Sequence, residues 1–149
     1  MGASANSKLI FPALGQVYAA VDEWTLPLLR LLAGLSMAMH GWVHIRGDMA
    51  QTAAYFASEG YAPGLFWAWA VTLTELVGGT CLAIGFLTRL VAVPILVFLI
   101  TAVFYHMRNG FFWNEGGFEY PLMWAAVVLV FLVKGGGRVS LDSLLGKNF

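Results

Sequence analysis

Four long apolar stretches constrain this chain more than any other feature of its sequence. They cover approximately residues 24–45, 64–86, 89–107 and 119–134. About 20 helical residues cross the roughly 30 Å of hydrocarbon in a bilayer. Backbone groups cannot stay unpaired in lipid, and the alternating pattern of barrel strands is absent, so we expect helices. The sequence therefore predicts an all-α fold: a polytopic membrane protein with a four-transmembrane-helix bundle and short interfacial end segments.

The composition supports a single membrane domain over residues 1–149. Hydrophobic residues make up 60% of the chain and charged residues 11%, whereas soluble domains carry about 25% charge. The eight basic and eight acidic residues cancel, and no basic cluster indicates a nucleic-acid partner. The single cysteine, Cys81, excludes an intramolecular disulfide and a cysteine-rich metal site.

The distribution of positive charge predicts the topology. The connection near Leu87 is so short that the second and third helices must be antiparallel neighbours. On the side of this turn and of both termini lie Lys8, Arg89, Lys134, Arg138 and Lys147. The opposite side holds only Arg46 and Arg108. Cytoplasmic loops carry the excess of positive charge, so we expect both termini in the cytoplasm.

The two ends of the chain are expected to lie at the membrane surface. Residues 9–20 are apolar, but Pro12, Gly15 and Gln16 interrupt the run, which predicts a short interfacial segment. Three glycines follow the fourth helix at residues 135–137. They should end that helix, and the apolar residues beyond them have the spacing of a surface-lying segment.

Six ionisable residues within the predicted helices are candidates for function: Arg30, His40, His44, Glu75, His106 and Glu119. Each costs at least ~2.5 kcal/mol inside a bundle, so it marks a functional hypothesis by default. His40 and His44 are four residues apart and share one helix face. All three histidines and Glu119 fall in one layer, towards the outer ends of the helices.

Several kinds of chemistry fit this layer. His40, His44 and His106 can be ligands of a transition metal, or two histidines can clamp a haem. Histidines and carboxylates near the interface can instead bind a quinone head group and move its protons. The structural alternative is hydrogen bonding between helices or to the lipid headgroups.

Glu75 lies near the middle of the second helix, where two interpretations stay open. Arg30 is close enough in depth to form a structural ion pair with it, or Glu75 is a catalytic carboxyl. Gly78 and Gly79 follow it and favour close packing of a neighbouring helix. Trp113 and most other tryptophans lie near the outer helix ends, where they form an interfacial belt or line a site.

The order of several motifs resembles the DoxX family of small bacterial membrane proteins. The resemblance covers about Pro27 to Leu145. The matching segments are Leu28–Gly34, Glu75–Gly79, Leu82–Arg89, His106–Phe112, Gly116–Leu122 and Gly137–Asp142. The family then shows Gly-x-x-Lys, where this chain has Gly41–His44, with histidine in place of the lysine. This departure favours a metal or haem role for the histidines.

The resemblance implies an oxidoreductase component of the bacterial inner membrane, because a related branch forms the membrane part of a thiosulfate:quinone oxidoreductase. We therefore expect a membrane subunit of a quinone-linked system, with lipid, further copies of the chain, or membrane or periplasmic redox subunits as partners. The expected catalytic residues are Glu75, His44, His106 and Glu119. The expected cofactor-binding residues are Arg30, His40 and Trp113, with quinone, haem or a transition metal as the cofactor. The alternatives are a non-catalytic anchor or assembly subunit and, less favoured, a transporter.

Overall fold

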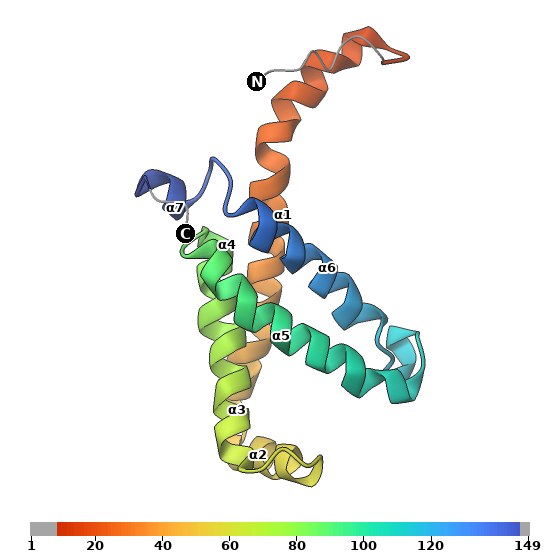
Figure 1. Cartoon of the computed structure of the whole chain (residues 1–149), viewed down its shortest axis with the longest axis vertical. Helices are drawn as coiled ribbons and strands as arrows, with labels where there is room; N and C mark the ends of the chain where they lie inside the picture. The colour runs from red at the N-terminus through yellow and green to blue at the C-terminus, as the bar shows by residue number, and fades with distance from the viewer. Residues whose placement is uncertain (1–8, 147–149) are drawn as a thin grey trace.

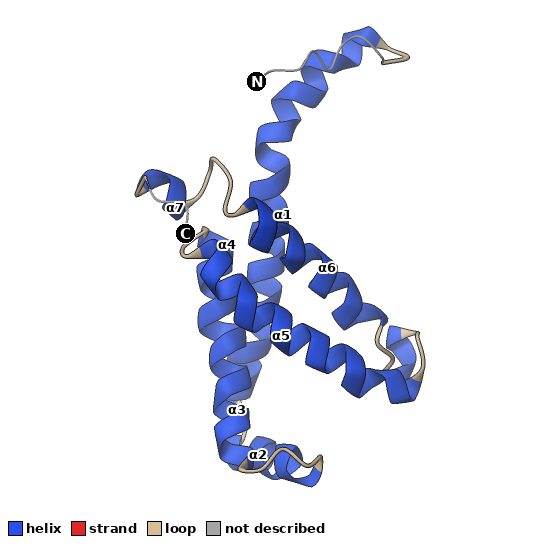
Figure 2. Cartoon of the chain, in the orientation of Figure 1, coloured by secondary structure: helices blue, strands red, loops and turns tan. Residues whose placement is uncertain are grey.

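The computed structural model describes residues 9–146, and this part of the chain contains helices and loops without a strand (Figure 2). The α-helices are α1 (Gly15–Arg46), α2 (Met49–Ser58), α3 (Gly64–Leu73), α4 (Gly79–Ile84), α5 (Thr88–His106), α6 (Glu119–Lys134) and α7 (Leu141–Leu144). A π-helix, η3 (Thr74–Gly78), joins α3 to α4, and 3-10 turns are η2 (Pro12–Leu14), η4 (Met107–Asn109) and η5 (Trp113–Glu115). The all-α prediction is confirmed.

Three helical segments in the described part of the chain are long and apolar enough to cross a membrane. They are Pro12–Arg46, Gly64–Ile84 and Thr88–Asn109. The fourth predicted span, α6, has 16 residues and a length of about 24 Å. That is less than the roughly 30 Å of hydrocarbon, so crossing by α6 stays a prediction.

The helical structure departs from the predicted boundaries at two places. The first helix begins at Gly15 and not near Trp24; Pro12 stands at the start of the preceding 3-10 turn, where a missing N–H costs nothing. The connection between the first two predicted spans, residues 46–63, also contains a helix, α2. The Asp48 side chain caps it by accepting a hydrogen bond from the Ala50 N–H at 2.8 Å.

The second helical unit comprises α3, η3 and α4, and glycines bring α1 against its η3 and α4 parts. A Cβ on Gly34 would lie 2.3 Å from the Ala83 nitrogen, and one on Gly79 would lie 2.6 Å from the Ala38 nitrogen. Only glycine permits two backbones to come this close. The predicted packing role of Gly79 is confirmed.

The last two long helices form an antiparallel hairpin. α5 and α6 run side by side and obliquely to α1 and α3 (Figure 1). Near its start α5 contacts η3 and α4, and further along it diverges from α3. The core where the layers meet contains Leu82, Ile95, Val128 and Phe131, all fully buried.

Arg30 holds the segment that follows α6, and it does not pair with Glu75. Its guanidinium donates hydrogen bonds to the carbonyl oxygens of Gly136, Val139 (2.9 Å) and Ala83 (3.4 Å). The ion pair with Glu75 that its depth indicated is therefore wrong. Carbonyl groups exposed by the glycine-rich segment lie nearer and satisfy the donors.

Asp142 fixes α7 to the turn between α4 and α5. Its carboxylate accepts hydrogen bonds from the N–H groups of Leu87 (2.7 Å) and Thr88 (2.9 Å) and from the Thr88 hydroxyl (2.7 Å). Burial opposes ionisation of this carboxyl, but these hydrogen bonds outweigh burial and lower its pKa. The expected surface-lying end is thus anchored to the bundle by a residue that is 2% exposed.

Candidate functional site

A local change of helix type places Glu75 at the centre of the candidate site. η3 interrupts the second helical unit at Thr74–Gly78, and π-bulges occur frequently at functional sites. Glu75 is 5% exposed. Its Oε2 lies 3.4 Å from Nε2 of His44, in the last turn of α1. This distance is within ion-pair range, but the geometry forms no hydrogen bond and leaves Oε2 unpartnered.

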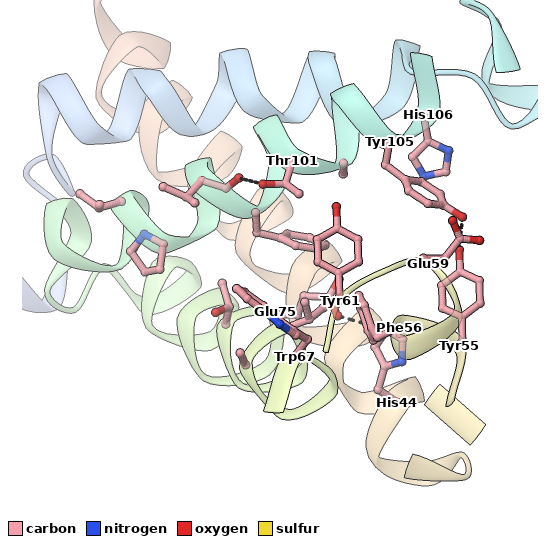
Figure 3. A pocket seen from close by; sticks show the side chains of 18 residues that line it. His44, Tyr55, Phe56, Glu59, Tyr61, Trp67, Glu75, Thr101, Tyr105 and His106 are labelled. Atoms are coloured by element: carbon pink, nitrogen blue, oxygen red, sulfur yellow. Dashed lines mark hydrogen bonds and ion pairs between the residues drawn. The ribbon is translucent and has the colours of Figure 1, made fainter. Parts of the chain in front are cut away.

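Both residues of this pair line a cavity of about 640 Å³. It lies between α2, the second helical unit and α5 (Figure 3). Its walls are mainly apolar: Ala70, Val71, Val93, Pro94, Val97, Phe98 and Ala102. Small-molecule sites typically measure about 300–1,000 Å³ and combine apolar walls with a few polar groups. The volume and the lining both fit a small ligand.

Polar contacts form the rim of this larger cavity, between α2 with its C-cap residue on one side and the end of α5 with η4 on the other. Arg108 donates to the Glu59 carboxylate at 2.9 Å, and its guanidinium lies 3.9 Å from the centroid of the Tyr105 ring. The hydroxyls of Tyr55 and Tyr105 are also hydrogen-bonded. The hydrogen bond from Arg108 lowers the pKa of Glu59. Figure 3 shows Tyr55, Glu59 and Tyr105 grouped beside one another, with Glu75 set apart from them.

A smaller cavity of about 140 Å³ lies on the other side of Glu75. Its polar lining comprises Ser36, His40, Glu75, His106, Tyr120 and Trp124. Glu75 Oε2 and Trp124 Nε1 are the two buried side-chain polar atoms without a hydrogen-bond partner in the described chain. Such atoms are rare in native structures and call for an explanation such as water or a ligand.

The structure brings four of the predicted site residues to these cavities. His44, Glu75 and His106 line the larger one, and His40, Glu75 and His106 the smaller one. His106 is oriented by a 2.7 Å hydrogen bond between Nδ1 and the Gly116 carbonyl oxygen.

Three other predicted site residues lie elsewhere. The Glu119 carboxylate accepts a hydrogen bond from the Trp113 N–H at 3.2 Å, and neither residue lines either cavity. Arg30 binds the carbonyl groups after α6. Glu119, Trp113 and Arg30 therefore contact other parts of the chain and do not line either cavity.

The three histidines are not gathered as a metal centre requires. Among residues 9–146, no group of three or more His, Cys, Asp or Glu side chains is placed to hold a metal ion. His40 and His44 share a helix, but they open onto different cavities with Glu75 between them. The spacing of His40 and His44 predicted that they share a helix face, but His106, the third predicted ligand, does not join both of them to form a metal site.

No residue of the rim is among the predicted site residues, because the sequence pattern predicted no helix between the first two spans. Tyr55, Glu59 and Tyr61 all come from α2 and the connection after it. A signal for this helix is present in the sequence. Asp48 is followed three residues later by Gln51, and this pattern is typical of a helix N-terminus.

The fold and site define a class of small helical membrane protein whose buried carboxyl faces an apolar cavity. Comparison with known families makes the class specific: residues 25–108 match the model of the DoxX family. The chain belongs to the DoxX family, as its motifs predicted.

Two relatives show how far the similarity extends. A Bacillus subtilis protein named "Putative oxidoreductase CatD" is 29% identical over 121 residues, which cover 81% of this chain and 87% of that protein. A Haemophilus influenzae protein named "Uncharacterized protein" is 32% identical over 84 residues. That match covers 54% of this chain, and the chain spans only about half (55%) of that relative's length. No solved structure matches the chain.

Proposed function

We propose that this protein is a membrane subunit of a quinone-linked oxidoreductase and that the quinone ring binds in the larger cavity. One observation carries the proposal: the buried carboxyl of Glu75 and the half-buried imidazole of His44, 3.4 Å apart, both line an apolar cavity of about 640 Å³. A quinone needs an apolar site for its ring and tail and proton donors beside its carbonyl oxygens. The name of the Bacillus subtilis relative supports oxidoreductase chemistry.

The reaction assigns a defined task to the site residues. A quinone becomes a quinol by taking up two electrons and two protons, one proton on each carbonyl oxygen. The electrons would come from a reducing redox subunit or a soluble reductant. Glu75, beside His44, would deliver one proton to the carbonyl oxygen that reaches this pair, because carboxyl and imidazole groups are effective general acids and bases. His106, which also lines the cavity, would deliver the other proton to the second carbonyl oxygen.

The walls of the larger cavity favour a lipid-soluble ligand. Trp67, Val93 and Val97 line it and are 39%, 48% and 61% exposed. They lie on α3 and α5, within segments long enough to span a membrane. Side chains exposed along such segments face lipid. A quinone would therefore enter sideways from the bilayer, between α3 and α5.

The proposal includes an orientation in the bacterial inner membrane. Arg89, Lys134 and Arg138 lie on the side of the α4–α5 turn and the segment after α6. The positive-inside rule places this side in the cytoplasm. The Glu75–His44 pair and the rim would then face the outer leaflet, where periplasmic redox subunits can supply electrons.

Quinone binding tests the proposal directly. Trp67 lines the larger cavity, so a bound quinone should quench its fluorescence. Ala70→Phe puts an aromatic ring into the cavity, whereas Ala126→Phe adds the same ring at an exposed position of α6 that lines neither cavity. We expect saturable quenching by a short-chain quinone that Ala70→Phe abolishes and Ala126→Phe preserves. Equal quenching in both variants would refute binding in this cavity.

An exposed aromatic cluster supports the second candidate, an assembly subunit. Phe111, Phe112 and Trp113 lie in the connection between α5 and α6 and are 47%, 60% and 65% exposed. Exposed aromatic residues are typical anchors of protein interfaces. Replacing all three with serine should release partner subunits during purification if this candidate is right, and it should leave quinone binding unchanged.

A further inference from the structure

We propose that the smaller cavity holds a chain of water molecules that carries protons between Glu75 and the surface at His40. The need for such a path rests on the proposed function, because a quinone reduced at Glu75 consumes protons that must be replaced. Its physical basis is the arrangement of polar groups around the smaller cavity, which exists without a quinone.

Glu75 forms the partition between the two cavities. It lines both of them, and so do Phe98, Ala102 and His106. The carboxyl is more than nine-tenths buried, and its Oε2 has no hydrogen-bond partner in the described part of the chain. A carboxyl in this position can exchange a proton with a ligand on one side and with water on the other.

A second unpartnered group indicates that the smaller cavity is wet. Trp124 Nε1 is a buried donor without an acceptor among the described residues, and Trp124 lines this cavity. A buried donor left unpaired costs about 1–3 kcal/mol, and a water oxygen removes that cost. The volume of about 140 Å³ admits about four waters at ~30 Å³ each.

The other polar side chains lead from Glu75 to the protein surface. Ser36 Oγ and Tyr120 Oη lie 3.4 Å apart at the edge of this cavity. Tyr120 is 40% exposed, and His40 is exposed as well. Imidazole takes up and releases protons near neutral pH. His40 lies six residues before the end of α1 at Arg46, about 9 Å along the helix. Its exposed side chain is therefore near the membrane surface, where it can exchange protons with the outside.

The transfer balances without a redox step. The Glu75 carboxyl gives its proton to the adjacent water, and each water passes one proton to the next. The last water passes one to the His40 imidazole. The products are a Glu75 carboxylate, a His40 imidazolium and an unchanged number of waters. Protons that enter from the surface run the same steps in reverse and restore the carboxyl.

Infrared spectroscopy of the purified, quinone-free protein tests the path. In mildly acidic buffer the Glu75 carboxyl gives a C=O stretch that is identified by its loss in Glu75→Gln. On transfer to D₂O the band shifts at the rate of proton exchange. Ser36→Leu fills the smaller cavity, and Ser36→Ala removes the same hydroxyl while leaving the space open. We expect Ser36→Leu to slow the shift by about tenfold or more, equivalent to ~1.4 kcal/mol of added barrier, and Ser36→Ala to leave it near the wild-type rate.

A second variant keeps the test decisive if Ser36→Leu impairs folding. His40→Leu changes only an exposed side chain at the end of the path, and it should slow the shift as well. If Ser36→Leu and His40→Leu both fold and both exchange at the wild-type rate, the proposal is wrong. Protons would then reach Glu75 through the larger cavity. Because no quinone is present, failure here leaves the quinone-binding result untouched, and failed quinone binding leaves this result untouched.

Discussion

Glu75 Oε2 lies 3.4 Å from His44 Nε2, so a π-helical turn of the second helical unit meets the last turn of α1 inside the bundle. The same two segments are packed tightly next to this contact, where a Cβ on Gly41 would lie 2.5 Å from the Leu76 nitrogen. The position of the carboxyl–imidazole pair therefore depends on the close approach of two backbones.

Replacing the buried carboxyl with an amide should remove proton delivery. Glu75→Gln keeps the size of the side chain, so quinone affinity should change little. Turnover should fall by about 10²–10⁴-fold, the usual contribution of general acid–base catalysis. The measurement is quinol formation by membranes that contain the protein with its reductant.

Glu119→Gln is the matched control for this prediction. It makes the same chemical change at a carboxylate that lines neither cavity and should keep wild-type turnover. If Glu75→Gln and Glu119→Gln lost turnover equally, the cavity would not be the site of catalysis.

Two adjacent glycines should respond differently to alanine. A Cβ on Gly79 would lie 2.6 Å from the Ala38 nitrogen, which is backbone, whereas one on Gly78 would lie 3.4 Å from the Ile95 side chain. Gly79→Ala should therefore separate α1 from α4 and destabilise the protein by about 1–3 kcal/mol. Gly78→Ala should be tolerated. Thermal unfolding in detergent measures both, and equal midpoints would contradict the close packing of α1.

The buried carboxylate of Asp142 should contribute to stability near neutral pH. Asp142→Asn loses acceptor capacity for the two N–H groups and the hydroxyl at the α4–α5 turn. We expect a loss of about 1.5–3 kcal/mol, the usual value for hydrogen bonds to a charged group. Asp22→Asn removes the same charge from an exposed position and should leave the unfolding midpoint unchanged.

The lowered pKa of Asp142 also predicts the sign of a pH effect. A carboxyl whose pKa is lower in the folded state stabilises the protein above its usual pKa of 3.8. This contribution is lost as the pH falls through the folded-state value. The difference in stability between wild type and Asp142→Asn should therefore be constant near neutral pH and shrink in acid below 3.8. A difference that grows in acid would contradict the assignment.

The rim contact should restrain α2. Glu59→Gln weakens the 2.9 Å contact with Arg108, so the amides of α2 should exchange faster with deuterium. Glu115→Gln changes an exposed carboxylate of η5 and should leave α2 unaffected. Hydrogen-exchange mass spectrometry measures the exchange of α2 and of η5 separately. Unchanged exchange in Glu59→Gln would show that the tyrosine pair or the packing of α2 on α3 suffices to hold it.

Helix identity was predictable from the sequence because hydrophobic length alone specifies a membrane-type helix. The three long apolar segments, the tight turn near Leu87 and the packing role of Gly79 all follow from composition and spacing. The start of α1 was predicted too late because Gly15 and Gln16 can begin a helix as well as interrupt an apolar run. The short α2 carried only a capping pattern at Asp48, which is a weaker signal than hydropathy.

The candidate site was predictable only in part. Glu75 and His44 were identified because ionisable groups in apolar helices are costly, but their pairing depends on rotation of the helices about their axes. Arg30 was assigned to Glu75 by depth, whereas tertiary structure brings the carbonyl groups after α6 to its guanidinium. The π-helical turn has no recognised sequence signature, so no pattern indicates that Glu75 separates two cavities.

Photo-crosslinking with a short-chain azidoquinone tests whether a quinone binds in the larger cavity. Illumination of wild-type protein in lipid should label peptides that carry Trp67, Val71 and Val97, which line the larger cavity. Ala70→Phe should remove this labelling, and Ala126→Phe should not. Labelling spread along the exposed face of α1 or α6, and equal in both variants, would show that the larger cavity is not a quinone site.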